Sequence, residues 1–498
     1  MSSITSQLQA ADFQPHEESQ LHSHWPNRFG VVPTPVRLNA VPEYTGRGVT
    51  IAFLDSGFYP HPDLTQPLNR IAAYFDVVTL DCHLAADQAP ADTAWHGTQT
   101  SVTAAGDGYL SQGIYRGLAP DAQVVLVKVS EDGRIKEENI ARGIRWVIAN
   151  KDRYNIRILS ISLGGDADIP HQDSIVDRAA EEAVAAGIVV IAAAGNSGCS
   201  KDHLTTPPAN SPSVIAVGGY NDHNKIEPAA LALYCSNYGV TADGIVKPEL
   251  IAPAIWVAAP ILPRTRVYEQ AVALDRLLNA PDYALSFLLR ETWQTAKLPG
   301  VLYRESIETM RAEIEAALRK HKFISAHYQH VDGTSFAAPI VASVVAQMLE
   351  ANPSLTPAAV RHLLISTADR LSDQAVLRQG YGVLNARRAV EQALIEEHAT
   401  SFAQLSAPRC EAGRIVFTHH DDAAQRVALA GDFNEWQPSR SLFTRTMEGV
   451  WRLALPSPKP GRYRYKFVID EQRWIDDPSN GMKEPDEYGG FNSILHVA

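Results

Sequence analysis

Between residues 48 and 220, apolar residues gather in short, nearly continuous runs separated by amphipathic stretches. The amphipathic stretches 136–152 and 174–187 carry apolar residues at helical spacing. Strands that are buried on both faces and alternate with helices are typical of a parallel sheet covered by helices. The pattern therefore predicts an α/β domain whose strands occupy the apolar runs, at residues 48–55, 122–129, 156–164, 187–195 and 213–220.

Residues 263–328 interrupt this alternation. They contain long amphipathic stretches in which Ile307, Met310, Ile314 and Leu318 recur at helical spacing. We expect inserted helices here, and a packed helical embellishment explains the pattern better than a separate catalytic module.

After about residue 398 the apolar period changes from helical to alternating. One face of the segment 461–470 would carry Tyr463, Tyr465, Phe467 and Ile469. Short alternating strands separated by Pro and Gly predict an immunoglobulin-like antiparallel β-sandwich. The expected organisation is an N-terminal arm at 1–45, an α/β domain at 46–398 with its insertion at 263–328, and a β-sandwich at 410–498.

Composition and charge narrow the function classes. The 498 residues include 45% hydrophobic and 20% charged residues, which is ordinary for a globular protein, and the formal net charge is −12. Neutralising nucleic-acid phosphates requires clustered Lys and Arg, so we expect no nucleic-acid partner. The run at 187–195 is the most tempting apolar stretch and is far shorter than the roughly 20 residues of a membrane span, so we expect no membrane partner.

The cysteines and the N-terminus bear on the compartment. Four scattered cysteines suggest neither a disulfide framework nor a zinc site, and residues 1–20 lack the basic start and apolar stretch of a secretory signal. We therefore expect a cytoplasmic protein with reduced thiols at Cys82, Cys199, Cys235 and Cys410.

Four reactive side chains stand where predicted strands end or predicted helices begin. Asp55 closes the first apolar run, His96 opens a small-residue helical stretch, Asn196 follows the run at 187–195, and Ser335 precedes a long apolar helix. In a parallel α/β sheet, the carboxyl ends of strands and the starts of the following helices meet along one edge. We expect these four side chains to converge.

The residue types fit acyl transfer. A serine hydroxyl becomes nucleophilic when a neighbouring base takes its proton, and His96 would be that base, oriented by Asp55. The Asn196 amide and the Ser335 N–H would stabilise the oxyanion, each donor contributing on the order of 3 kcal/mol. Taken alone, Ser335 could equally be a helix cap, and Asp55 and Asn196 could be turn residues.

Several segments resemble the subtilisin-like serine proteases over residues 45–395. They are "GVTIAFLDSGFYPHPDL", "WHGTQT", "ISLGG", "AAAGNSG" and "DGTSFAAPIVA", in the Asp–His–Asn–Ser order of that family. The resemblance implies a triad of Asp55, His96 and Ser335 with Asn196 as oxyanion donor. It also implies that Ser162, Leu163 and Gly164 line the pocket for the residue before the scissile bond, on a strand that binds extended peptide by strand addition.

The chain departs from the family pattern at three places. Gln99 stands where a second His is usual, and Phe336 where a Met follows the nucleophile. The insertion lies close to Ser335 in sequence and could gate access to it. The resemblance implies no required cofactor; Asp63 matches a family calcium ligand, but the rest of that site is not recognisable, which leaves calcium open.

The C-terminal segment resembles the glycogen-binding module of AMP-activated kinase regulatory subunits and branching enzymes. The resemblance covers about residues 413–498. It implies that Trp436 and Trp474 stack on sugar rings, that Lys466 donates to a sugar hydroxyl, and that Tyr488 and Asn492 make contacts at the rim of the site. A Trp face suits the C–H face of glucose. Alternatively, both Trp side chains fill the core of the sandwich, or the module serves only docking or stability.

Two functions follow. The first is a serine endopeptidase acting on proteins or peptides, with an α-glucan such as glycogen as a further partner. The second is a catalytically silent protease fold that binds glucan or acts as a scaffold. An α/β-hydrolase esterase does not fit, because its nucleophile motif G-x-S-x-G would need Gly where Ala337 stands.

Overall fold

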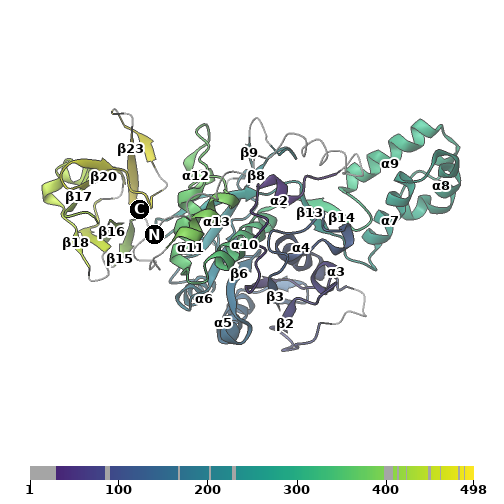
Figure 1. Ribbon diagram of the computed structural model, residues 1–498, viewed down its shortest axis with the longest axis horizontal. Helices are drawn as coiled ribbons and strands as arrows, with labels where there is room; N and C mark the ends of the chain where they lie inside the picture. Colours follow the sequence, from purple (N-terminus) through teal and green to yellow (C-terminus); the bar gives the residue numbers. More distant parts are fainter. Residues whose placement is uncertain are drawn as a thin grey trace, which may run out of the picture.

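The computed structural model describes most of residues 30–497 and shows three parts along its longest axis (Figure 1). The α/β domain lies in the middle, the C-terminal sandwich at one end and the helical insertion at the other. The description omits residues 1–29, 85–89, 166–168, 201–202, 227–230, 397–407, 412–413, 422, 447–449, 460, 481–482, 487, 489 and 498. Most of the predicted N-terminal arm therefore lies outside the described residues.

A seven-strand parallel core forms the centre of the α/β domain, and a short antiparallel strand, β9 (Ala232–Leu233), extends its sheet beside β8. The strand order is β12-β8-β7-β6-β1-β3-β2. Five of these strands fall on the predicted apolar runs: β1 (Thr50–Asp55), β3 (Gln123–Lys128), β6 (Ile156–Ile161), β7 (Val189–Ala193) and β8 (Ile215–Asn221). The other two are β2 (Ile71–Asp76) and β12 (Leu250–Pro253).

Helices cover both faces of this sheet, so its strands are apolar on both sides. One hydrophobic core joins the sheet to α4 (Ala94–Ala105), α10 (Thr334–Ala351), α11 (Pro357–Thr367) and α13 (Ala386–Ile395). A second core joins the opposite face to α5 (Glu137–Tyr154) and α6 (Ile175–Ala185). The predicted α/β sheet flanked by helices is confirmed.

Helix α10 runs through the centre of the first core. By length and composition it is the one helix among the described residues that could span a membrane, and 83% of its apolar window is buried inside the protein. It is thus a longer apolar segment than the run at 187–195. Its burial against the sheet accounts for its composition.

The insertion consists of three helices with a core of their own, as the helical spacing predicts. They are α7 (Arg266–Leu278), α8 (Asp282–Ala296) and α9 (Ile307–His321). Thr265 and Ser306 cap the first and third, each accepting a hydrogen bond from the N–H three residues later. The antiparallel pair β13 (Val257–Pro260) and β14 (Tyr328–Val331) closes the base of the insertion, and β14 leads directly into α10.

The C-terminal part is a sandwich of two antiparallel sheets around one core. One sheet has the order β15-β16-β19-β18 and the other β17-β20-β23-β22, with β21 beside β20. Tyr465, Phe467 and Ile469 of β20 lie in the shared core and Tyr463 packs at its margin, as the alternation predicts. The strands are β15 (Arg409–Glu411), β16 (Arg414–His420), β17 (Val427–Gly431), β18 (Thr444–Arg445), β19 (Val450–Pro456), β20 (Gly461–Ile469), β21 (Arg473–Ile475), β22 (Lys483–Pro485) and β23 (Phe491–Val497).

Both flanking segments are bonded to the α/β domain. The described part of the arm includes α2 (Thr34–Arg37), whose buried Arg37 guanidinium pairs with Asp222 at 2.7 Å and donates to two backbone carbonyls. At the other end of the chain, the Tyr381 hydroxyl donates to the Ser479 carbonyl of the sandwich.

Candidate active site

Asp55 ends β1 with its carboxylate buried at the edge of the sheet. The N–H of Ser56 donates to Asp55 Oδ1 at 2.7 Å, and the Thr100 hydroxyl donates to Oδ2 at 3.3 Å. These bonds fix the carboxylate in one orientation, with both oxygens still able to accept from another group.

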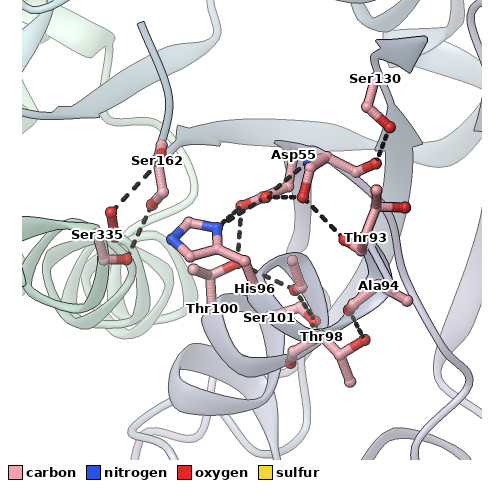
Figure 2. A network of polar contacts seen from close by, with 12 residues as sticks. Asp55, Thr93, Ala94, His96, Thr98, Thr100, Ser101, Ser130, Ser162 and Ser335 are labelled. Carbon is pink, nitrogen blue, oxygen red and sulfur yellow. Dashed lines mark hydrogen bonds and ion pairs between the residues drawn. The ribbon is translucent and has the colours of Figure 1, made fainter. Parts of the chain in front are cut away.

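His96 lies in the first turn of α4, directly opposite Asp55. Its Nδ1 lies 2.8 Å from Asp55 Oδ1 and 3.0 Å from Oδ2, and Figure 2 shows the other ring nitrogen directed toward Ser335. Burial lowers the pKa of His96, but the charge and the hydrogen bond of Asp55 outweigh it and raise that pKa above 6.5. Asp55 therefore fixes the tautomer of the ring and stabilises its protonated form.

The glycine of the "HGT" motif permits this approach. A Cβ on Gly97 would lie 2.3 Å from the Gly57 carbonyl oxygen and 2.8 Å from the Asp55 Cβ. Only a residue without a side chain lets α4 pack this closely against the end of β1.

Ser335 stands in the first turn of α10, where backbone N–H groups have no partner within the helix. Its hydroxyl donates to the Ser162 carbonyl at 3.5 Å and is not bonded to His96 in the described structure, a looseness that is common before substrate binds. Pro339 lies four residues further along and has no N–H for the Ser335 carbonyl. That carbonyl instead accepts from the Ser162 hydroxyl at 2.9 Å.

Asn196 follows β7 and is tied to the start of α10. Its Oδ1 accepts hydrogen bonds from the Thr334 N–H at 2.9 Å and the Thr334 hydroxyl at 3.1 Å. With its oxygen engaged, the amide presents its NH₂ group as the free donor. The sequence offered no signal for the role of Thr334, which depends on a contact between residues 138 positions apart.

A cavity of about 380 Å³ opens beside these groups. It contains His96, Asn196 and Ser335, together with Trp95, Phe336 and residues of β14. His321 and Lys322, at the end of the last insertion helix, also line it. The insertion therefore forms part of the wall of the site. In the sequence, the only indication of this was that the insertion lies close to Ser335.

The four predicted residues thus meet at one edge of the sheet, and comparisons with known proteins agree with their pattern. The model of the subtilase family matches residues 46–382, about two thirds of the chain. The chain belongs to the subtilase family. Serine protease AprX of Bacillus subtilis is 33% identical over 355 residues, which cover 70% of this chain and 67% of AprX. The α/β region is therefore that of a subtilisin-like serine endopeptidase.

Other relatives match over shorter lengths. Subtilisin E of Bacillus subtilis is 36% identical over 206 residues, 41% of this chain, and the chain spans about half the length of that relative (48%). The CspB protease structure from Clostridium perfringens superposes with a TM-score of 0.53 at 15% identity, covering 74% of this chain and 98% of that one. This likeness supports the fold alone.

Of the other predicted protease residues, Ser162, Leu163 and Gly164 follow the end of β6, and the Ser162 carbonyl lies 3.5 Å from the Ser335 hydroxyl. Gly164 is exposed, and a Cβ on it would lie 2.7 Å from the Pro207 carbonyl oxygen. Gln99 is buried and donates to the Pro260 carbonyl at 2.9 Å, so it joins α4 to β13 instead of entering the site. Phe336 packs within 5.9 Å of the His96 ring, centroid to centroid.

The surroundings of Asp63 do not fit a calcium ion. Its buried carboxylate accepts the Tyr328 hydroxyl at 2.6 Å and the Leu110 N–H at 3.1 Å, so both oxygens are engaged. The Arg70 guanidinium donates to the Asp63 carbonyl, which brings a positive charge beside the position. Calcium takes six to eight oxygen ligands, and among the described residues no cluster of three His, Cys, Asp or Glu could hold a metal.

The expectation of reduced cysteines is wrong for one pair. Cys199 and Cys235 form a disulfide with their Cα atoms 5.2 Å apart. Their pairing depends on the fold of the intervening chain, which their spacing of 36 residues does not reveal. Cys82 is free and exposed, and the side chain of Cys410 lies outside the described residues.

The C-terminal sandwich matches the model of carbohydrate-binding module 48, the isoamylase N-terminal domain, over residues 404–483. The chain therefore carries a carbohydrate-binding module after its protease domain. Membership of this module family does not specify the sugar, which depends on the arrangement of the contact residues.

Both predicted stacking residues lie on the outer face of the β17–β20–β21 sheet. Trp436 packs on Ala428, Ala430 and Val468, which form a small cluster apart from the sandwich core. Val468 pairs with Trp474, which is 44% exposed. The tryptophan inside the core is Trp451, so the alternative in which Trp436 and Trp474 fill the core is wrong.

The predicted polar contacts adjoin this face. Lys466 alternates with the core residues of β20, and its ammonium pairs with Asp486. Asn492 precedes Ser493, the partner of Tyr465, so strand alternation places it on the Lys466 side. Tyr488 is 92% exposed, and its N–H donates to the Asp486 carboxylate at 2.8 Å. Asp486 thus connects Lys466 to the loop that carries Tyr488.

Proposed function

We propose that this chain hydrolyses peptide bonds through Ser335, His96, Asp55 and Asn196. The observation that supports it most directly is the pair of contacts from His96 Nδ1 to Asp55, with the other ring nitrogen facing the serine at the start of α10. A capping or turn role explains any one of these residues, but it does not explain a buried carboxylate that orients a histidine toward a helix-start serine.

In the proposed reaction each of these groups has a role. His96 takes the proton of the Ser335 hydroxyl as that oxygen attacks the scissile carbonyl, and Asp55 stabilises the resulting imidazolium. The Asn196 NH₂ and the Ser335 N–H donate to the oxyanion. His96 then protonates the leaving amine, and a water molecule, deprotonated by the same ring, hydrolyses the acyl-enzyme.

Covalent labelling tests this proposal against the catalytically silent alternative. A fluorophosphonate probe should label the wild type and leave Ser335→Ala unlabelled. Ser354→Ala, which removes an exposed serine elsewhere, should label like the wild type. Failure of the folded wild type to react would favour the scaffold role instead.

We further propose that the insertion restricts the enzyme to flexible chains, because His321 and Lys322 narrow the approach to Ser335 from one side. Replacing residues 263–325 by a short turn keeps the β13–β14 pair. We expect the ratio of the cleavage rate of a folded protein to that of a short peptide to be higher in this variant than in the wild type. An unchanged ratio would remove the gating role.

For the sandwich, we propose binding of an α-glucan such as glycogen at the face of Trp436 and Trp474. The supporting observation is that both side chains stay outside the core beside a lysine and an asparagine, the combination that suits a sugar ring and its hydroxyls. Such binding would place proteolysis close to stored polysaccharide.

A further inference from the structure

The loop that carries Asn196, residues 195–199, is bonded to a second segment, residues 235–237. We call these two bonded segments the strap. The Ser197 N–H donates to Asn237 Oδ1 at 2.6 Å, and the Gly198 N–H donates to the Cys235 carbonyl at 2.9 Å. The Asn237 N–H donates back to the Gly195 carbonyl at 3.0 Å. The Cys199–Cys235 disulfide adds a covalent bond at the outer end of this strap.

The second segment is itself anchored in the central sheet. The Ser236 hydroxyl is buried and accepts the N–H of Gly219, a residue of β8, at 2.7 Å. The two segments touch so closely that a Cβ on Gly198 would lie 1.7 Å from the Ser236 carbonyl oxygen. The bonds between residues 195–199 and 235–237 therefore fix the position of Asn196 relative to the sheet.

On its other side, the Asn196 side chain is held by two hydrogen bonds from Thr334, at the start of α10. The Asn196 side chain is exposed, so packing contributes little to its position. Its alignment with the Ser335 hydroxyl consequently depends on the loop at 195–199 keeping its register against residues 235–237. The disulfide lies three positions from Asn196, and it joins an exposed cysteine, Cys199, to a half-buried one, Cys235.

We propose that the Cys199–Cys235 disulfide is a positioning element for the oxyanion donor and that its reduction lowers the turnover of the enzyme. This inference rests on the proposed role of Asn196. A donor displaced by a fraction of an ångström still binds substrate but stabilises the transition state less.

The redox step needs a dithiol reductant. One thiolate of the reductant attacks Cys199 Sγ or Cys235 Sγ and displaces the other cysteine as a thiolate, and the second thiol of the reductant then resolves the mixed disulfide. Two electrons and two protons pass to the protein, which gains two thiols, and the reductant leaves as its own disulfide. In a reducing compartment such as the cytoplasm, the open and less active form would predominate.

The test compares turnover of a peptide p-nitroanilide before and after dithiothreitol treatment, in the wild type and in Asn196→Ala. Reduction should lower the wild-type kcat roughly three- to tenfold with little change in KM, which is less than the 10²-fold or more expected for deleting the donor. In Asn196→Ala, reduction should have no further effect, because the group that the disulfide positions is gone. Cys199→Ser with Cys235→Ser should reproduce the reduced state and ignore dithiothreitol.

Two controls separate positioning from stability. Cys82→Ser removes a free, exposed thiol and should respond to dithiothreitol like the wild type. The thermal unfolding midpoint of each sample should show that the reduced protein is folded at the assay temperature.

The remaining outcomes overturn the inference in distinguishable ways. Equal losses in wild type and Asn196→Ala, an unchanged wild-type kcat, or unfolding on reduction each overturn it alone. Wild-type kcat in Asn196→Ala before any reductant is added overturns it together with the proposed oxyanion role of that residue.

Discussion

Thr334 holds the side-chain oxygen of Asn196 with two hydrogen bonds, at 2.9 Å from its N–H and 3.1 Å from its hydroxyl. The residue just before the proposed nucleophile therefore orients the proposed oxyanion donor. The Thr334 hydroxyl also accepts the Gly195 N–H at 3.2 Å, so a single buried side chain joins both halves of the site.

Thr334→Val should lower kcat about tenfold while KM stays near the wild-type value, because the isosteric change removes the hydroxyl and leaves the Asn196 amide less well oriented. Thr334→Ser keeps the hydroxyl and should retain most of the activity. Steady-state kinetics with a chromogenic peptide measure both. A rise in KM with kcat unchanged would show that Thr334 acts on substrate binding instead.

The pH dependence of kcat/KM should report His96. The general base must be neutral, and Asp55 raises the pKa of His96, so activity should rise with pH through a midpoint above 6.5. In Asp55→Asn the negative charge that raises the pKa of His96 is lost. The midpoint should therefore move to lower pH, and kcat should fall by about 10⁴. Asp152→Asn, which changes a carboxylate that is 92% exposed, should leave the profile unchanged.

Removal of divalent cations should leave the unfolding midpoint unchanged, because the Tyr328 hydroxyl and the Leu110 N–H already satisfy Asp63. Tyr328→Phe should lower the free energy of unfolding by about 1–3 kcal/mol, since a buried carboxylate loses a hydrogen-bond donor. Thermal unfolding with and without EDTA measures both effects. A midpoint that falls with EDTA in the wild type would restore the calcium hypothesis.

Trp436→Ala combined with Trp474→Ala should abolish retention on a glycogen column and leave peptide hydrolysis intact. The two side chains lie on the outer face of the sandwich, so the core should remain folded. Tyr109→Ala is a matched control, because it removes an aromatic side chain that is 49% exposed in the protease domain. Unchanged retention of the double variant would place sugar binding on another surface.

Sequence reasoning succeeded where local patterns dictate structure. The apolar runs predicted five strands of the sheet, and the rule that strand ends share an edge brought Asp55, His96, Asn196 and Ser335 together. Alternation along residues 461–470 identified the core face of the sandwich.

What the sequence could not provide depends on contacts between distant residues. Asp63 and Tyr328 are 265 positions apart, and nothing in "HPDL" indicates that a tyrosine satisfies the carboxylate. The cysteine pair was missed for the same reason, because scattered cysteines do not reveal which of them a fold brings within bonding distance. The wall contributed by His321 and Lys322 follows from how the insertion packs, which helical spacing does not specify.

Pro339 interrupts the backbone hydrogen bonding of α10, and the carbonyl that it leaves free connects this helix to the end of β6. Because Pro339 offers no N–H, the Ser335 carbonyl is bonded to the Ser162 hydroxyl, at the end of the strand proposed to hold the substrate backbone. The Ser335 hydroxyl in turn donates to the Ser162 carbonyl at 3.5 Å, so two hydrogen bonds join residues 173 positions apart. The start of α10 and the end of β6 are thereby held in one register.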